Sequence, residues 1–155
     1  MQIATTGLLA MLAALLLRAA ATDMRARLIS NRLNLTIALL ALLWWFAAGL
    51  DAGDMLVRVG MAAAVLILFG GCFALGLMGG GDVKLLTALA LWLSPGTMMA
   101  LLFWMALAGG LLTLAMLLIH RLRGDRRTLE IPYGLAIVTA ALPIVTNHIL
   151  TTLAA

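Results

Sequence analysis

Long apolar segments alternate with short polar connections along the whole chain. A transmembrane α-helix needs about 20 apolar residues, so several such helices with short loops account for the full length. Six segments fit this pattern, at residues 3–21, 35–50, 56–78, 83–93, 98–119 and 132–155. The pattern therefore predicts an all-α integral membrane protein with about six transmembrane helices, in a single membrane domain over residues 1–155.

The composition supports this prediction and leaves no part of the chain for a water-soluble domain. Of the 155 residues, 65% are hydrophobic and 10% are charged, whereas soluble domains are about half apolar and a quarter charged. The mean hydropathy is +1.17. The single cysteine, Cys72, lies in an apolar segment, so the sequence contains neither an internal disulfide nor a cysteine pair for zinc.

The charged residues are distributed unevenly between the connections. Those after the first, third and fifth segments carry Arg25, Arg27, Arg32, Lys84, Arg121, Arg123, Arg126 and Arg127. The connection after the second segment instead carries Asp51 and Asp54. Because cytoplasmic loops are rich in lysine and arginine, the odd-numbered loops are predicted to be cytoplasmic and both termini periplasmic. Arg58 is the exception, and its long side chain is expected to reach back to the membrane surface.

The fourth segment, residues 83–93, is too short to cross a bilayer alone. Its eleven residues would extend about 16 Å as a helix, against a hydrocarbon core of about 30 Å. Either the helix begins earlier, in the glycines of "GGGD", or its end lies below the membrane surface. Both alternatives place Asp82 at or inside the cytoplasmic membrane boundary.

Two aspartates are predicted on this same side, Asp23 at the end of the first segment and Asp82 at the start of the fourth. An ionisable group at a membrane-embedded helix end indicates a functional site. Two adjacent carboxyl groups can share one proton, so that one activates a water molecule and the other polarises a carbonyl group. Such a pair can cleave a peptide bond without a metal or another cofactor, and motifs for the rival proteolytic chemistries are missing from the sequence.

The glycines before Asp82 fit this interpretation. Gly79, Gly80 and Gly81 would leave room for an extended peptide substrate, and they allow positive φ and a sharp entry to the next helix. Lys84 is placed to screen the carboxyl pair or to orient one of its members. A simpler interpretation makes Asp82 only a helix cap. Glycines in membrane helices also serve close packing, which is expected at residues 107–112, "LAGGLL".

Three motifs together resemble a known family. The first is D-x-R-x-R-x-I-x-N, formed by Asp23, Arg25, Arg27, Ile29 and Asn31; the second is "GGGDVK"; the third is "IPYGLAI" at residues 131–137. In this order they resemble the type IV prepilin peptidases, which are membrane aspartyl proteases of the GxGD type. The resemblance is to the short form that serves Flp/Tad-type pili, and it covers nearly the whole chain.

The resemblance implies a function and a set of site residues. Asp23 and Asp82 would be the catalytic pair, and the supporting or substrate-approach residues would be Gly79, Gly80, Gly81, Lys84, Arg25, Asn31, Pro132, Tyr133 and Gly134. The family removes the short basic leader from pilin and pseudopilin precursors at the cytoplasmic side of the bacterial inner membrane. The family usually has a proline where Ser30 stands, so the turn after the first segment is expected to be softer.

Longer members of the family carry an N-terminal cysteine-rich domain with two CxxC pairs and also methylate the product. This chain begins in the first apolar segment, so we expect peptidase activity without methyltransferase activity. The expected partners are a prepilin precursor and the lipid bilayer, with a homo-oligomer or the pilus-assembly machinery as further candidates and no nucleic acid. The alternatives are a non-catalytic scaffold of pilus assembly and a small transporter with the two aspartates as a proton relay.

Overall fold

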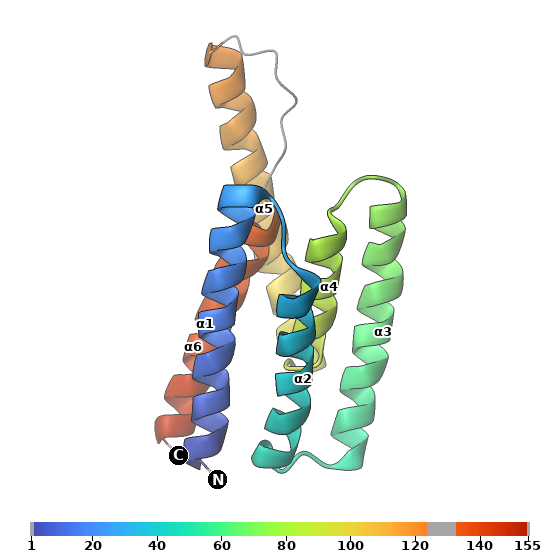
Figure 1. Ribbon diagram of the computed structural model, residues 1–155, viewed down its shortest axis with the longest axis vertical. Helices are drawn as coiled ribbons and strands as arrows, with labels where there is room; N and C mark the ends of the chain where they lie inside the picture. The colour runs from blue at the N-terminus through green and yellow to red at the C-terminus, as the bar shows by residue number, and fades with distance from the viewer. Residues whose placement is uncertain (1, 124–132, 155) are drawn as a thin grey trace.

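The computed structural model describes residues 2–123 and 133–154, and these residues form six α-helices joined by short connections (Figure 1). The helices are α1 Gln2–Ala26, α2 Asn31–Ala48, α3 Ala52–Ala74, α4 Gly80–Ala90, α5 Pro95–Arg123 and α6 Tyr133–Ala154. All except α4 are long and apolar enough to cross a membrane. The chain is therefore a multi-pass membrane protein with an all-helical fold.

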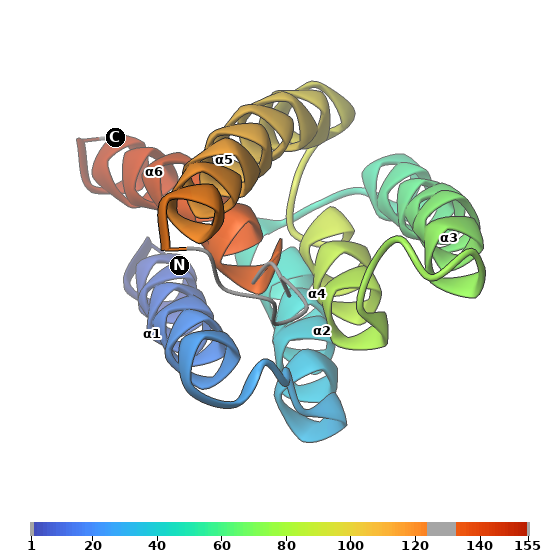
Figure 2. The same cartoon turned by 90° about the horizontal axis from the view of Figure 1, so that it is seen from above.

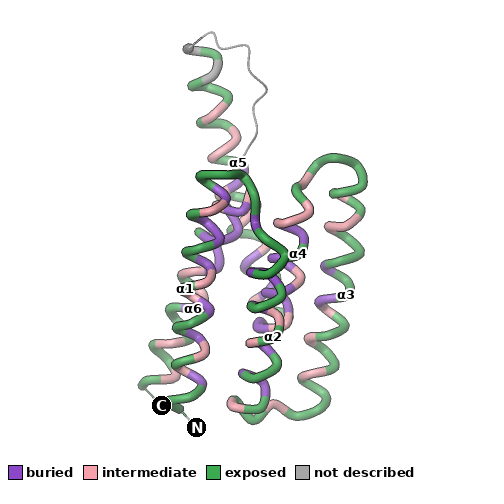
Figure 3. Tube along the Cα trace, in the orientation of Figure 1, coloured by how far each residue is buried: buried purple, intermediate pink, exposed green. Residues whose placement is uncertain are grey.

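The helices form a bundle with α4 at its centre (Figure 2). The closest neighbours are α1 with α6, α3 with α4, and α5 with α6, and α2 packs on both α1 and α4. Buried residues gather on the facing sides of α1, α2, α4 and α6, whereas α3 and the second half of α5 are mostly exposed (Figure 3). Exposed apolar side chains on these two helices suit contact with lipid.

Both chain ends lie at one end of the bundle, and the α1–α2 and α3–α4 connections lie at the other (Figure 1). This arrangement agrees with six alternating segments. Which end faces the cytoplasm stays a prediction from the positions of the basic residues.

The short fourth segment begins in the glycines, as one of the two alternatives predicted, because α4 starts at Gly80. The third segment was predicted at about residues 56–78, and α3 lies one helical turn earlier, at Ala52–Ala74. Asp51 caps the start of α3 by accepting a hydrogen bond from the Asp54 amide at 2.8 Å. Gly76, with φ of 72°, follows the end of α3 in a left-handed conformation that stops a helix regardless of the apolar residues beyond it.

The last turn of α4 ends inside the bundle, at about half the height of α2 and α3 (Figure 1). Carbonyl groups at a buried helix end need donors from elsewhere in the protein. Trp45 Nε1 donates to the Leu91 carbonyl oxygen at 2.7 Å, and Arg58 Nη1 donates to the Trp92 carbonyl oxygen at 2.7 Å. These two side chains hold the end of α4 in place.

Arg58 therefore does not reach back to the membrane surface, and that prediction was wrong. Its guanidinium group lies over the Trp44 ring, 5.4 Å from the ring centre, while it donates to the Trp92 carbonyl. The physical reason is the short neighbouring helix, because its unpaired carbonyl attracts a charged donor more strongly than a distant surface does.

Trp45→Phe is expected to lower the free energy of unfolding by about 1–3 kcal/mol, because the partly buried Leu91 carbonyl loses its donor. Thermal unfolding in detergent micelles measures this change. Trp104→Phe is the matched control, since Trp104 is 56% exposed. Equal losses in the two variants would contradict the assigned role of the Trp45 hydrogen bond.

Candidate active site

Asp23 and Asp82 lie at the same end of the bundle, near the end of α1 and in the first turn of α4. They are buried, with 5% and 8% of their surfaces exposed, and no other ionisable side chain whose burial the structure describes is classed as buried. The charge of Asp23 acts on the carboxyl group of Asp82. The structure thus brings together the two aspartates that the sequence singled out.

The carboxylate of Asp23 is held by the first turn of α6. The Leu135 amide donates to Asp23 Oδ2 at 3.0 Å, and the Gly134 amide also donates to this carboxylate. A Cβ atom at Gly134 would lie 2.7 Å from Asp23 Oδ2, so only glycine allows this approach. Free amides and the helix dipole make a helix start a favourable place for a negative charge.

The carboxyl group of Asp82 folds back over the start of its own helix. Gly79 is the N-cap residue of α4, and its amide donates a hydrogen bond to Asp82. A Cβ atom at Gly79 would lie 2.9 Å from Asp82 Oδ2. The capping interpretation of Asp82 is therefore correct in part, because Asp82 caps α4 and also faces the charge of Asp23.

The three glycines before Asp82 do not use positive φ, and that expectation was wrong. The described glycines with positive φ are Gly49 and Gly76, in the turns after α2 and α3. Gly79 instead makes room for the Asp82 carboxyl group, and Gly81 makes room for Ile29, whose carbonyl oxygen would lie 3.0 Å from a Cβ atom there. Close approach between segments, rather than an unusual backbone conformation, requires glycine at these two positions.

Ile29 and Asn34 belong to the surroundings of the site, although Asn34 was not selected from the sequence. The Ile29 side chain lies against both Gly81 and Gly134, and so separates the starts of α4 and α6. Asn34 is buried and donates from Nδ2 to the Gly81 carbonyl oxygen at 2.9 Å. A lone amide in the apolar stretch "LNLTIALL" was the available signal.

The other predicted residues lie around this centre. Lys84 and Asn31 are exposed, and the Lys84 ammonium group donates to Asn31 Oδ1 at 2.8 Å, so it is engaged there rather than with a carboxylate. Arg25 is exposed near the end of α1, and Tyr133 is half-buried at the start of α6. Pro132 lies outside the described residues.

Ser30 occupies the place where the family usually has proline, and it caps α2. Its hydroxyl oxygen accepts a hydrogen bond from the Leu33 amide at 3.3 Å. A capping side chain fixes the entry into the helix. The turn before α2 is therefore ordered by a hydrogen bond where a proline ring would order it by its fixed φ.

The environment of Asp82 favours its protonated form. Asp82 lies in α4, outside the five membrane-spanning helices. Burial raises the pKa of its carboxyl group to about 6, and the negative charge of Asp23 acts in the same direction. The hydrogen bond from the Gly79 amide opposes part of this shift. At pH values up to about 6 the pair can therefore hold a proton on Asp82, which is the state required for acid–base chemistry.

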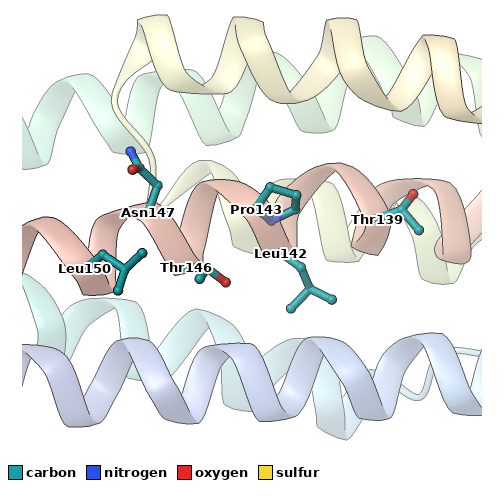
Figure 4. Close-up of a pocket in the computed structure, with 6 residues that line it drawn as sticks. All are labelled: Thr139, Leu142, Pro143, Thr146, Asn147 and Leu150. Carbon is teal, nitrogen blue, oxygen red and sulfur yellow. The ribbon is translucent and has the colours of Figure 1, made fainter.

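An open apolar pocket on the surface of α6 lies apart from the aspartates. It encloses about 620 Å³ and is lined by Thr139, Leu142, Pro143, Thr146, Asn147 and Leu150, all from α6 (Figure 4). None of these residues belongs to the first turn of α6, where Asp23 is held. In the described part of the chain no three metal-ligating side chains gather at one place. The chemistry offered at the candidate site is that of two carboxyl groups and backbone amides.

Residues 10–114 match the model of a family described as the type IV leader peptidase family. The matched region includes both aspartates and the glycines before Asp82, and it spans more than half of the chain. No curated protein and no solved structure gives a significant match.

Gly134→Ala is expected to lower the free energy of unfolding by about 1–3 kcal/mol, because the added methyl group collides with Asp23 and Ile29. Thermal unfolding in detergent micelles measures the loss. In Gly7→Ala the new Cβ atom meets nothing within 4 Å, so this control should be unchanged or up to about 1 kcal/mol more stable. A fully stable Gly134→Ala protein would show that the close approach is not required.

Proposed function

Because the chain belongs to the type IV leader peptidase family, we propose that it removes the short basic leader from type IV prepilins or pseudopilins of the Flp type. Membership of the family makes it a protease with prepilin-type substrates in general. The use of two aspartates, the Flp-type substrate and the cytoplasmic side are the parts that we propose. The proposed activity is the peptidase step alone.

The observation that carries the mechanism is the different surroundings of the two buried carboxyl groups. Asp23 accepts hydrogen bonds from two amides at the start of α6, which offset part of the cost of burying its negative charge, whereas Asp82 accepts one, from the Gly79 amide. Asp82 has a pKa raised to about 6 by burial and by the charge of Asp23. The proton of the pair is therefore assigned to Asp82 in the resting site, and Asp23 is assigned the role of base.

The assigned roles give a complete hydrolysis. Asp23 takes a proton from water as the water oxygen attacks the scissile carbonyl carbon, and Asp82 donates its proton to the carbonyl oxygen. The carbonyl then re-forms, the carbon–nitrogen bond breaks, and Asp23 gives its proton to the leaving amine. The hydroxyl proton of the intermediate returns to Asp82. The pair ends in its starting state, with one peptide bond and one water molecule converted to a carboxyl group and an amine.

Basic residues of the sequence lie in the same connections as the two aspartates, and basic connections are typical of the cytoplasmic side. This distribution supports an active site at the cytoplasmic side of the bacterial inner membrane. A basic leader that approaches a negatively charged pair is favoured electrostatically.

A scaffold or a proton-coupled transporter explains these features less well. A scaffold would gain nothing from two buried carboxyl groups, because burying such groups costs free energy. A proton relay would place its carboxyl groups along a path through the membrane. Asp23 and Asp82 instead lie together at one end of the bundle.

Asp23→Asn and Asp82→Asn should each lower the rate of precursor cleavage by about 10²–10⁴-fold, because each removes one half of the acid–base pair. Processing of a co-expressed Flp-type prepilin, seen as a size shift on a gel, measures the effect, with membrane levels of each variant checked. Asp54→Asn is the control, since Asp54 is exposed in the first turn of α3. Normal processing by either of the first two variants would eliminate the two-carboxylate mechanism.

The cleavage rate should fall as pH rises through about 6, because the pair then loses the proton that Asp82 holds. The raised pKa makes the protonated, active form dominant below this value and the doubly ionised, inactive form dominant above it. Initial rates on a purified prepilin in detergent, measured across this range, show the transition, and Asp54→Asn should keep the same profile. A rate that rises steadily through the same range would refute the assignment of the proton to Asp82.

A further inference from the structure

Asn34 joins the first turn of α2 to the first turn of α4, beside the candidate active site. Its side chain is 4% exposed, and Nδ2 donates to the Gly81 carbonyl oxygen at 2.9 Å. Gly81 immediately precedes Asp82 in the chain. The hydrogen bond from Asn34 therefore acts on the backbone that carries one of the two carboxyl groups.

The side-chain amide of Asn34 uses only one of its two polar atoms in this contact. Its Oδ1 atom is buried, and no hydrogen-bond donor for it is found among the described residues. A buried acceptor without a donor costs free energy, and such a group in a native protein calls for a specific explanation.

The Gly81 carbonyl group does not need Asn34 for its own hydrogen bonding. Gly81 belongs to the first turn of α4, Gly80–Ala90, and such a carbonyl oxygen accepts from the helix amide four residues later. Asn34 thus adds a second donor to a group that the helix already satisfies. A leucine at position 34 would match asparagine in the number and branching of its side-chain atoms, without an unpaired acceptor. Stability alone therefore favours an apolar side chain at this position.

The contacts around Gly81 show what the additional hydrogen bond controls. On one side Ile29 lies so close that its carbonyl oxygen would be 3.0 Å from a Cβ atom at Gly81. The first turn of α2 is also fixed, because Ser30 Oγ accepts from the Leu33 amide at 3.3 Å and the Ser30 carbonyl oxygen accepts from the Asn34 amide at 3.2 Å. Asn34 therefore reaches Gly81 from an ordered base.

The Gly81 carbonyl and the Asp82 amide belong to one planar peptide group. A hydrogen bond that fixes the direction of this carbonyl also fixes the backbone from which the Asp82 side chain extends. The charge of Asp23 acts on the Asp82 carboxyl group, so the orientation of Asp82 matters to the pair. A misplacement of about 1 Å in an active site can lower the rate about 100-fold. The benefit of the Asn34 hydrogen bond is therefore expected in rate and not in stability.

We propose that Asn34 is a positioning residue of the peptidase site, which holds the Gly81–Asp82 peptide group so that the Asp82 carboxyl group faces Asp23. The unpaired Oδ1 atom is the cost in stability of keeping the Nδ2 donor at this place. The proposal rests on the proposed peptidase function, but the position of Asp82 can be measured without any cleavage.

Asn34→Leu tests the proposal, because it removes the donor and the unpaired acceptor together. The variant should unfold at the same temperature as the wild type in detergent micelles, or at a higher one, since no buried polar group is left unpaired. For cleavage of a purified prepilin, kcat should fall roughly tenfold or more while KM stays within about twofold of the wild type. An unchanged kcat would overturn the proposal.

The pKa of the Asp82 carboxyl group, followed by carbon-13 NMR, is the second measurement. In Asn34→Leu it should fall by about 0.5 or more, because the carboxyl group moves away from the charge of Asp23 or out of its buried place. Trp45→Phe is the matched control, since it removes the hydrogen bond from α2 to the Leu91 carbonyl at the other end of α4. This control should leave the pKa of Asp82 unchanged.

Two results of the NMR measurement would overturn the positioning role. One is the same Asp82 pKa in Asn34→Leu as in the wild type. The other is an equal shift in Trp45→Phe, which would show that any loosening of α4 has this effect. A shift confined to Asn34→Leu, together with a wild type that cleaves no prepilin, would refute the proposed function and uphold the positioning of Asp82 by Asn34.

Discussion

The hydrogen bond from the Leu135 amide to Asp23 Oδ2 joins residues 112 positions apart in the sequence, and the arrangement of the site depends on it. A buried carboxylate needs donors, and the start of α6 supplies two backbone amides for this purpose. Gly134 makes the approach possible, since any side chain there would occupy the place of the carboxylate. The first and last helices of the fold are thereby fixed to each other at the point where the chemistry is proposed.

The short helix α4 holds the second carboxyl group of the pair, that of Asp82, in its buried position. A full-length membrane helix would place both of its polar ends at the surface, whereas α4 ends inside the bundle (Figure 1). Its first turn is capped by Asp82 through the Gly79 amide, and its last carbonyl groups receive donors from Trp45 and Arg58. Because both ends are satisfied internally, α4 can hold a carboxyl group buried beside Asp23.

The sequence predicted the helical fold, the short fourth helix and the placement of Asp23 and Asp82 at helix ends on one side, because apolar periodicity and isolated charges are local signals. It did not predict the partner of Arg58 or the contact between Asn34 and Gly81. Those contacts join segments that are far apart in the chain, 34 residues in one case and 47 in the other. Only the packing of the helices decides them.

The glycines before Asp82 are a second case in which the sequence could not predict a contact. The sequence marked Gly79 and Gly81 as positions that require glycine and offered two causes. Room for a peptide substrate stays a prediction, whereas positive φ was wrong. Positive φ is a local property, whereas the observed cause is the closeness of Asp82 and Ile29. The sequence can mark such a glycine, but it cannot identify the residue whose close approach in space requires it.

The most direct test of the central claim, that the two aspartates form one electrostatically coupled pair, is the titration of Asp82. Carbon-13 labelling of aspartate carboxyl groups allows its pKa to be measured by NMR in detergent micelles, in the wild type and in Asp23→Asn. The account predicts a pKa of about 6 for Asp82 in the wild type. In Asp23→Asn the pKa should be lower, because the neighbouring negative charge is gone, yet still raised by burial. An Asp82 pKa that is the same in both proteins would contradict the account.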